Sequence, residues 1–371
     1  MSQKYSATPF TDYIYSKASR NRIPISGTFE LSPICNFSCR MCYVHKSKKE
    51  VAESPRGILT LEQWIQIAKE AREAGMLYLL LTGGEPFLWP DFWKLYEQLV
   101  WMGFLISINT NGSLIDDEVI ERLKRLPPKR VNITLYGASD KTYETLCQVK
   151  GVFSKVDHAI RSLQEAGIQV KLNGSLTSYN AEDLEQMVKY SEERKLVFQA
   201  TTYMFPPIRR DTALVGMNDR LTPEEAARYR LKCLYLQFGK EQYNSFLQNV
   251  KKGYSPPPGL DESCLDPLDG KIRCRAGKAS FWITWDGWIT PCGLMNEPKV
   301  DMKKNSFSAA WNKLVDESNR LVTSGLCARC ANQEICHPCA AMALAETGKV
   351  SGVPEYLCRM VQEIRRIACE Q

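Results

Sequence analysis

Between residues 28 and 205, short apolar segments alternate with longer amphipathic segments. Parallel strands need a crossover helix between them, so this alternation predicts an α/β fold built on a parallel sheet. The predicted strands are Thr28–Ile34, Leu77–Leu81, Leu105–Asn109, Val131–Tyr136, Val170–Leu176 and Val197–Tyr203. These six units are too few for a closed eight-stranded barrel. We therefore expect a partial (β/α)6 barrel, open on one side, with ligands at the carboxyl ends of its strands.

Helix starts and chain breaks predict the domain organisation. A capping box at Thr60–Gln63 starts one helix, and a second box at Thr222–Glu225 starts another after the barrel. The proline-rich stretch 255–259 ends that second helix. The predicted parts are an N-terminal extension (1–27), the barrel (28–207), a helical bridge (208–262) and a cysteine-rich C-terminal domain (263–371).

Cysteine content narrows the function. The chain has 14 cysteines and only three histidines among 371 residues. The N-terminus lacks an apolar signal block, and the longest apolar run, Met76–Leu81, is too short to cross a bilayer. We therefore expect a cytosolic protein, in which clustered thiols indicate metal or redox chemistry rather than disulfides. Iron–sulfur clusters and zinc are the metals that such thiolates favour.

Charge gives no sign of a nucleic-acid or membrane partner. The net charge is +6, and its basic residues are scattered. Lys46–Lys49 is the one local cluster, and we interpret it as a solvated loop.

Three cysteines follow the first predicted strand directly. Cys35, Cys39 and Cys42 lie within eight residues, and no further cysteine follows before Cys147. A [4Fe–4S] cluster normally takes four cysteines, so three leave one iron open for another ligand. A zinc knuckle or incidental buried thiols are the alternatives.

This CxxxCxxC spacing resembles the hallmark of the radical S-adenosylmethionine (SAM) superfamily. The resemblance implies that the amino and carboxylate groups of SAM fill the open iron position, and that Tyr43 lies near the adenine. Thr82-Gly83-Gly84-Glu85-Pro86, after the second strand, is similar to the GGEP loop of the family, and this implies that Glu85 binds the SAM ammonium group. Asn109-Thr110-Asn111-Gly112, after the third strand, resembles the family's TNG turn.

Three further SAM contacts follow from the same resemblance. Ser107 and Asn109 are candidate contacts to the ribose. Lys150 stands near the position where relatives have an arginine close to the SAM carboxylate. The resemblance covers residues 28–205 and the loops that follow the first three strands.

The C-terminal cysteines form a second pattern. Seven of the 14 cysteines fall between Cys274 and Cys358, and their spacing, with Gly287 and Cys292, resembles the SPASM domain of peptide- and protein-modifying radical SAM enzymes. The resemblance implies two auxiliary [4Fe–4S] clusters with interleaved ligands, and hence three clusters in total. The first would take Cys274, Cys292 and Cys339, with Cys264 as a possible fourth ligand, and the second would take Cys327, Cys330, Cys336 and Cys358.

Zinc is the alternative metal for these pairs, because CxxC pairs suit zinc equally well. The region has little apolar sequence of its own, so we expect its clusters to keep it folded. Three cysteines remain unassigned. We interpret Cys147 and Cys233 as buried apolar residues and Cys369 as a thiol at a frayed end.

The resemblance implies a reaction class. An electron from the first cluster, supplied by a reductant such as ferredoxin or flavodoxin, breaks a SAM C–S bond. The resulting 5′-deoxyadenosyl radical then abstracts hydrogen from the substrate. We expect a peptide or protein substrate that is oxidised or crosslinked. A small molecule such as a tetrapyrrole is the alternative, and a non-enzymatic metal-binding protein is a third reading.

Two details narrow the peptide-modifying class. Formylglycine-forming enzymes of this type place an Asp directly after the cysteine equivalent to Cys292, and this chain has Gly293 there. Only 34 residues precede Cys35. We therefore expect a peptide substrate to be recognised by another surface or by a separate protein.

Overall fold

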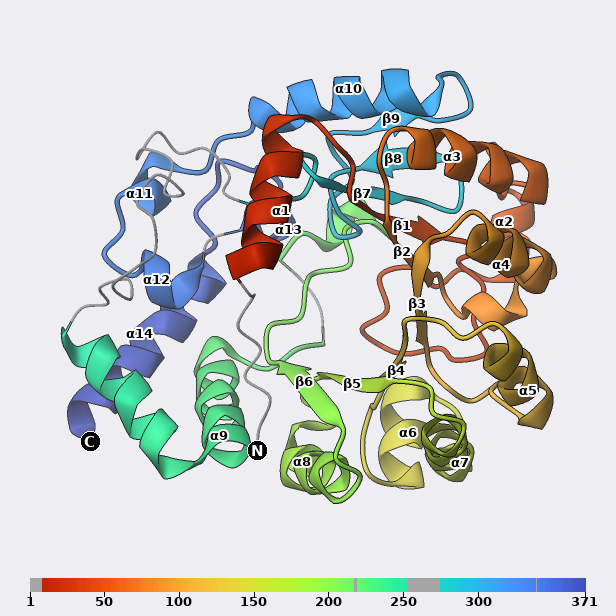
Figure 1. The fold of residues 1–371 in the computed structure, drawn as a ribbon. Helices are drawn as coiled ribbons and strands as arrows, with labels where there is room; N and C mark the ends of the chain where they lie inside the picture. The colour runs from red at the N-terminus through yellow and green to blue at the C-terminus, as the bar shows by residue number, and fades with distance from the viewer. Residues whose placement is uncertain (1–8, 217–218, 253–273, 338) are drawn as a thin grey trace.

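The protein is built around one large sheet. The computed structural model describes residues 9–216, 219–252, 274–337 and 339–371. Its sheet has nine strands in the order β6-β5-β4-β3-β2-β1-β7-β8-β9 (Figure 1). The first six strands pair in parallel, each with its neighbours along the chain. These strands are β1 (Ser26–Glu30), β2 (Tyr78–Thr82), β3 (Leu105–Thr110), β4 (Arg130–Thr134), β5 (Val170–Ser175) and β6 (Val197–Thr201).

These strands confirm the predicted partial barrel. Each begins within two residues of its predicted start, and helices follow them on the outer side of the curved sheet (Figure 1). The helices of this layer are α2 (Lys48–Ala52), α3 (Leu61–Glu73), η1 (Pro86–Leu88), α4 (Phe92–Trp101), α5 (Asp117–Arg125), α6 (Asp140–Cys147), α7 (Phe153–Glu165), η2 (Ala181–Asp183) and α8 (Leu184–Glu193). The capping box at Thr60–Gln63 is present, and α3 starts where it predicts.

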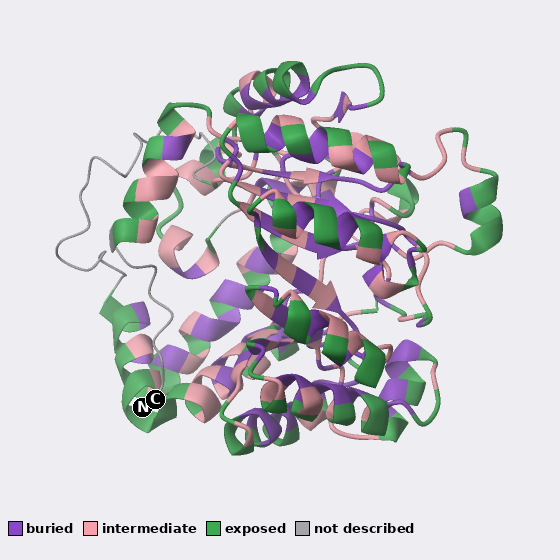
Figure 2. Cartoon of the chain, turned by 45° about the vertical axis from the view of Figure 1, so that its right-hand side comes forward, coloured by how far each residue is buried: buried purple, intermediate pink, exposed green. Residues whose placement is uncertain are grey.

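Side chains alternate between the two faces of the sheet. Phe29 of β1 faces the helix layer and stacks on Trp64 of α3, with 4.7 Å between ring centroids. Val131 and Ile133 of β4 are fully buried on the same side. The inward positions between them carry polar side chains, such as Arg130 and Asn132, which line a cavity. The sheet therefore packs apolar side chains against the helices and lines the cavity with polar ones. Figure 2 shows that exposed residues lie mainly on the outward faces of the helices, while the strands are mostly buried or half-buried.

Three C-terminal strands extend the sheet beyond the predicted six. β7 (Ser280–Ile283) pairs in parallel with β1, and β8 (Trp288–Thr290) and β9 (Val300–Asp301) continue antiparallel from it. β7 covers an edge of β1 that would otherwise expose unpaired backbone groups. The sheet thus joins the predicted barrel to the predicted C-terminal domain. The four-part division of the chain stays a prediction.

The remaining helices are α1 (Pro9–Arg20), η3 (Thr212–Leu214), α9 (Pro223–Lys252), α10 (Phe307–Asn319), α11 (Gly325–Ala328), α12 (Gln333–Cys336), α13 (Ala340–Thr347) and α14 (Glu355–Glu370). Of these helices, α10 lies beside α3 and continues the outer layer, and α9 and α11 to α14 lie on the side of the barrel away from α3 to α5 (Figure 1). The capping box at Thr222–Glu225 starts α9 as predicted, and the backbone of α9 is non-helical at Gly239. None of the described helices combines the length and apolar composition needed to span a membrane.

The chain after β6 is fastened to the C-terminal helices by a buried ion pair. Arg220 and Glu346 are 9% and 6% exposed, and the hydroxyl of Tyr203 donates to the same carboxylate at 2.6 Å. Tyr356 of α14 lies under the guanidinium, with 3.9 Å between its ring centroid and Arg220 Cζ. This cluster holds α13 and α14 against the end of the barrel.

Candidate active site

The loop of the first cysteine triad is held by the end of α6. The backbone N–H groups of Ser38 and Arg40 each donate at 3.1 Å, to the carbonyls of Cys147 and Leu146. Gln148 Nε2 donates to the carbonyl of Ser38 at 2.8 Å. The last carbonyls of a helix have no partner within the helix, so the loop satisfies groups that α6 leaves open. The cysteine loop is therefore a fixed part of the fold.

The three thiols lie in the wall of one cavity. Cys35, Cys39 and Cys42 surround a cavity of about 200 Å³ at the carboxyl ends of the strands, as the barrel fold predicts. Burial raises the pKa of Cys35 to about 12 and also raises the pKa of Cys42. The nearby thiols add to both shifts. A bound metal compensates for such shifts, because it stabilises the thiolate directly.

Backbone donors point at the cysteine sulfurs. The N–H groups of Phe37 and His45 donate at 3.3 Å to the sulfurs of Cys35 and Cys42. Hydrogen bonds of this kind favour the thiolate form that a metal needs. In the part of the chain that the structure describes, no backbone N–H donates to the thiols of Cys147 or Cys233. The triad thus differs from ordinary buried cysteines.

Cys147 is buried as predicted, but it also touches the triad. A hydrogen bond from its thiol is the main cause of the lowered pKa of Cys39, and Tyr136 contributes a second one. Tyr136 follows β4 and lines the cavity, and it was not predicted from the sequence as a site residue. Its place after a strand was the signal that could have found it.

Gly83 and Gly84 pack against the chain that leads into the triad. An added Cβ at Gly84 would lie 2.4 Å from the carbonyl oxygen of Ile34, and one at Gly83 would lie 2.5 Å from that of Ser32. The N–H of Gly84 donates to Ser32 at 2.7 Å. Any side chain would push the two segments apart. The glycines therefore set the distance between the second loop and the cysteine loop, and both line the cavity.

Glu85 lies behind the cavity wall. Its side chain is fully buried, and its carboxylate accepts hydrogen bonds from the Thr110 hydroxyl at 2.8 and 2.9 Å and from the Asn111 N–H at 2.9 Å. Burial raises its pKa to about 7. Pro86 is buried beside it, at the start of η1. This placement favours a positioning role in which Glu85 joins the second loop to the third, and direct contact with SAM stays a prediction.

The third loop reaches the triad through Asn111. Its side-chain amide donates to Asn36 at 2.9 Å and lies 3.7 Å from the sulfur of Cys35. Asn109, Thr110 and Asn111 all line the cavity. The three loops that the sequence singled out therefore meet at one place.

A buried ion pair connects this site to the C-terminal region. The Glu30 carboxylate, at the end of β1, accepts from the Arg209 guanidinium at 2.8 and 2.9 Å and from Trp282 Nε1 at 2.9 Å. Arg209 also donates to the carbonyl of Gly293 at 2.7 Å, and its Cζ lies 5.7 Å from the centroid of the Tyr43 ring. Tyr43 lines the cavity, as the SAM prediction requires. Glu30 was not predicted from the sequence as a site residue, although a carboxylate within a predicted buried strand indicates a buried charged partner.

The first group of C-terminal cysteines comes together as predicted. Cys274, Cys292 and Cys339 line one small cavity of about 30 Å³. Burial, with a smaller contribution from the two other thiols, raises the pKa of Cys292 to about 11. Backbone N–H groups donate to the sulfurs of Cys292 and Cys339, as they do in the triad. Cys264 lies outside the described residues.

The second group comes together separately. Burial raises the pKa of Cys336 to about 11, and the charges of Cys358, Cys327 and Cys330 add to the shift. Cys336 thus lies near these three cysteines. Cys339, only three residues later in the sequence, lies instead with Cys274 and Cys292. This placement matches the interleaved grouping that the family resemblance implied, and ligation of two clusters stays a prediction. Among the described residues, no three His, Cys, Asp or Glu side chains lie close enough together to hold a single metal ion.

Comparison with known proteins decides the family. The model of the radical SAM superfamily matches residues 29–191. A probable GTP 3′,8-cyclase of Saccharolobus islandicus is 31% identical over 274 residues, which cover 73% of this chain and 83% of the relative. The chain belongs to the radical SAM superfamily. It is therefore an enzyme, and members of this superfamily use a [4Fe–4S] cluster and SAM.

Other relatives of this radical SAM enzyme differ in their substrates. An AdoMet-dependent heme synthase of Methanosarcina barkeri is 22% identical over 338 residues, covering 86% of this chain and 92% of the relative. The sporulation killing factor maturation protein SkfB of Bacillus subtilis is 29% identical over 288 residues, covering 77% of this chain and 64% of the relative.

Two solved structures share the fold of the enzyme. Streptococcus suis SuiB bound to the precursor peptide SuiA has a TM-score of 0.68 at 17% identity, covering 96% of this chain and 82% of SuiB. Native anSMEcpe with bound AdoMet has a TM-score of 0.66 at 18% identity, covering 94% of this chain and 97% of that one. Both share the overall fold of this chain over more than nine-tenths of its length.

Two predicted SAM contacts lie elsewhere in the enzyme. Ser107 lines the neighbouring larger cavity rather than the cavity of the triad. The Lys150 side chain is 84% exposed, pairs with Glu144 at 3.2 Å, and is not among the residues that line the triad cavity. An exposed lysine in a surface ion pair is poorly placed to bind a buried carboxylate. We therefore leave Lys150 out of the site. Cys233 is buried and Cys369 exposed, as predicted.

Proposed function

We propose that this radical SAM enzyme oxidises or crosslinks a peptide or protein substrate in the barrel cavity, next to the first auxiliary cluster. The observation that carries the proposal is a cavity of about 610 Å³. Its wall combines inward-facing residues of β1 to β4 with Cys274 and Cys292 of the C-terminal region. A cavity of this size suits a small ligand or a few residues of a peptide.

The residues of the triad cavity would hold SAM and its cluster. Cys35, Cys39 and Cys42 would supply three thiolates and leave one iron for SAM. When bound, the cluster and SAM would supply a one-electron cleavage that yields a hydrogen-abstracting adenosyl radical. Gly83 and Gly84 would present backbone groups to the bound cofactor, and Tyr43 an aromatic face. The buried Glu30–Arg209 pair would keep Tyr43 in place and water out.

One hydrogen bond joins the walls of the two cavities. Asn132 Nδ2, in the larger cavity, donates at 2.7 Å to Asn109 Oδ1, in the cavity of the triad. A substrate in the larger cavity would therefore lie between the SAM site and Cys292. This order suits an oxidation in which the substrate loses a hydrogen atom toward the SAM site and an electron toward the cluster at Cys292.

Peptide-related names among the relatives support the substrate class. SkfB is a maturation protein, and SuiB has been solved with a precursor peptide. A separate recognition protein and a reductant such as ferredoxin or flavodoxin belong to the same proposal. A tetrapyrrole is the second candidate. The heme synthase match over most of both chains favours it, and so do the basic residues of the larger cavity.

Anaerobic reconstitution with iron, sulfide, SAM and a reductant tests the first step. The protein should form 5′-deoxyadenosine, and replacing Cys35, Cys39 and Cys42 by Ala should abolish this product. Cys369→Ala is the matched control, since that thiol is exposed and unassigned. Normal product formation by the triple variant would overturn the assignment of the triad.

Metal content tests the auxiliary clusters. Three [4Fe–4S] clusters predict about 12 iron atoms per chain, and the triad variant should lose about four of them. Zinc as the main metal beyond the triad would contradict the proposal. If Cys264 is a ligand, Cys264→Ala should free about one iron and change the spectrum of the first auxiliary cluster.

Substrate addition separates the two candidates. A peptide substrate should raise the yield of 5′-deoxyadenosine and lose hydrogen mass itself, whereas a tetrapyrrole should do so in its place. Candidate peptide substrates are those encoded by short open reading frames beside the gene of this enzyme. Turnover of a tetrapyrrole alone would replace the peptide proposal by the second candidate.

A further inference from the structure

The larger cavity has basic residues at one end and no acidic residue to neutralise them. Lys129 and Arg130, at the start of β4, line this cavity. No Asp or Glu is among the described residues that line it. Lys171 of the adjacent strand β5 pairs with Asn132 of β4 across the sheet. Its side chain therefore leaves the sheet on the same face as that of Asn132.

Arg130 has no protein partner in the described structure. Its side chain forms no hydrogen bond or ion pair with any described residue, and its Nε is fully buried. Buried guanidinium groups are normally paired, because taking a charge out of water is costly. The other arginines of the barrel interior and its exit follow this rule, since Arg209 pairs with Glu30 and Arg220 with Glu346.

Two further cations lie near Arg130, and each has a contact with an uncharged group. Lys129 Nζ lies 4.4 Å from the centroid of the Tyr78 ring, and Lys171 donates to the amide oxygen of Gln199. Burial, and then the charge of Arg130, lower the pKa of both lysines. Arg130 is thus close enough to both lysines to repel them, and no Asp or Glu is among the described residues that line the cavity.

The same wall leaves a buried acceptor open. Asn132 is 7% exposed, and its Oδ1 has no hydrogen-bond partner among the described residues. The Arg130 side chain is half-buried with its Nε unpaired, and Asn132 adds an unpaired buried acceptor, so this cavity wall leaves polar groups open to an occupant.

We propose that Lys129 and Arg130 form an anion-binding end of the substrate cavity and bind a carboxylate of the substrate. Arg130 supplies a planar fork that matches a carboxylate, and Lys129 adds a second charge. The proposal rests on the proposed function in taking this cavity as the substrate site. A carboxylate held there would extend the rest of the substrate toward Asn132 on one side and Cys292 on the other. Arg130 and Lys129 are positioning residues in this scheme.

Binding to the reconstituted full-length enzyme tests the proposal with two kinds of anionic probe. One is coproporphyrin III, a tetrapyrrole with four carboxylates, compared with a tetracationic pyridylporphyrin. The other is the amidated peptide Gly-Glu-Glu-Gly, compared with Gly-Gln-Gln-Gly. Arg130→Gln should weaken binding of the matching anionic probe by about ten- to a hundredfold, the usual range for a hydrogen bond to a charged group. It should leave the comparison probe unaffected.

The identity of the affected probe names the source of the carboxylate. Loss of coproporphyrin binding alone assigns it to a tetrapyrrole, and loss of acidic-peptide binding alone assigns it to a peptide. Arg130→Lys keeps the charge but loses the planar fork, so its affinity should fall between those of wild type and Arg130→Gln. Arg125→Gln, on the exposed side of α5, is the matched control and should change nothing. Equal affinity of wild type and Arg130→Gln for both anionic probes would overturn the proposal.

Stability separates this role from a structural one. Since Arg130 has no partner to lose, Arg130→Gln should not lower the Tm. A lowered Tm with unchanged probe affinity would show a structural residue and overturn the proposal. SAM cleavage without substrate should continue in Arg130→Gln, because Arg130 does not line the triad cavity. Failure of wild type to cleave SAM would instead contradict the proposed function.

Discussion

Two stretches of the C-terminal region, residues 280–319 and 321–339, lie next to each other in sequence but are stabilised differently. The first forms β7 to β9 and α10, and its side chains Phe281, Phe307 and Trp311 join the main hydrophobic core. In the second, Ile335 is the only buried apolar residue among those described, and Leu326 is 76% exposed. The second stretch contains four cysteines that the proposal assigns to two clusters.

This difference corrects one expectation. The sequence predicted little apolar sequence in the whole C-terminal region, and this is wrong for residues 280–319. β7 pairs with β1, and Glu70 of α3 accepts a hydrogen bond from the first N–H of α10 at 2.6 Å. Apolar burial and strand pairing attach this stretch to the barrel. Cluster dependence therefore remains a prediction for residues 321–339 alone.

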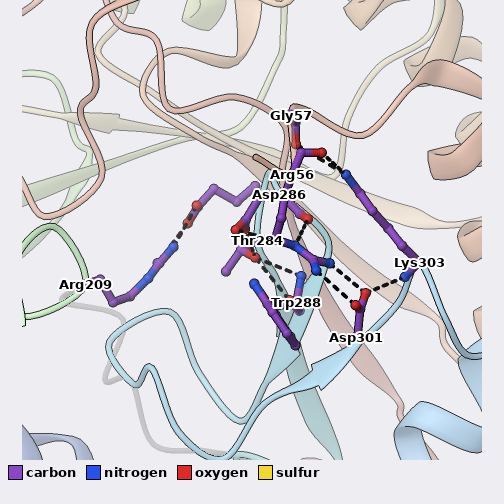
Figure 3. A network of polar contacts seen from close by, with 9 residues as sticks. Arg56, Gly57, Arg209, Thr284, Asp286, Trp288, Asp301 and Lys303 are labelled. Carbon is purple, nitrogen blue, oxygen red and sulfur yellow. Dashed lines mark hydrogen bonds and ion pairs between the residues drawn. The ribbon is translucent and has the colours of Figure 1, made fainter. Parts of the chain in front are cut away.

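A network of polar contacts adds to the attachment of the first stretch. Arg56, in the loop before α3, donates to both carboxylate oxygens of Asp301 at 2.6 and 2.9 Å and to the carbonyl of Asp286 at 3.0 Å (Figure 3). Its Cζ lies 4.1 Å from the centroid of the Trp288 ring. Lys303 reaches back to the carbonyls of Arg56 and Gly57 (Figure 3). The hairpin is thus joined to the barrel on its outer side as well.

The largest expected effect comes from removing two cysteines of the second stretch. In Cys330→Ala/Cys336→Ala, we expect amide protection in residues 324–339 to fall by about tenfold or more, because little apolar burial remains there. Protection in β7 and β8 should be unchanged. Anaerobic hydrogen exchange with mass spectrometry measures both in one experiment. Equal loss in the two stretches would break the comparison, and Cys369→Ala serves as the control.

The next effect tests the first stretch. Trp311 is 2% exposed, packs on Phe281 and donates to the carbonyl of Arg22 at 2.6 Å. Trp311→Ala should lower the free energy of unfolding by about 3–5 kcal/mol, the usual cost of such a core truncation. Leu326→Ala, in the second stretch, should change it by less than about 0.5 kcal/mol. Urea unfolding of the metal-free protein measures both, and similar losses would contradict the difference drawn here.

A smaller loss is expected at Arg56. Its guanidinium and the Asp301 carboxylate are 22% and 11% exposed, so water screens the pair only partly. Arg56→Gln should lower the free energy of unfolding by about 1.5–3 kcal/mol, the range for hydrogen bonds to charged groups. Lys49→Gln is the control, because its pair with Glu53 is exposed and should contribute less than about 0.5 kcal/mol. Equal effects of the two substitutions would show that the network adds nothing to the attachment.

The last prediction concerns Glu85 in the barrel and the pH dependence of the free energy of unfolding. Burial raises the pKa of Glu85 to about 7 from the ordinary 4.5, so the native state holds this proton more tightly than the unfolded state does. This contribution to stability is therefore fully present below pH 4.5 and is lost as pH rises toward about 7. Glu85→Gln should flatten the pH dependence of unfolding across this window in the metal-free protein.

Two substitutions sharpen the role of Glu85. Exposed Glu62→Gln should leave the pH dependence as in wild type. Thr110→Val removes the hydroxyl donor to Glu85, and it should weaken SAM binding together with Glu85→Ala if Glu85 acts by positioning the third loop. The loss expected for Glu85→Ala is about one to two orders of magnitude in affinity. Weak binding in Glu85→Ala alone would favour direct contact with the ammonium group.

Local patterns in the sequence determined much of the architecture. The six parallel strands, the two capping boxes and the meeting of the three loops at the triad follow from periodicity and turn chemistry over a few residues. The grouping of Cys336 apart from Cys339 followed from spacing and family resemblance. These features depend on neighbours in the chain or on the order of strands, and both can be read without coordinates.

Tertiary structure alone decided the contacts between distant segments. It placed β7 on the edge of β1, turned Lys150 to solvent, and put Glu85 behind the cavity wall. It also left Arg130 without a partner. A strand pattern says that a side chain points inward, but not which charges from other strands and loops it meets there. That requires the packing of segments 26 to 252 residues apart, which local periodicity does not encode.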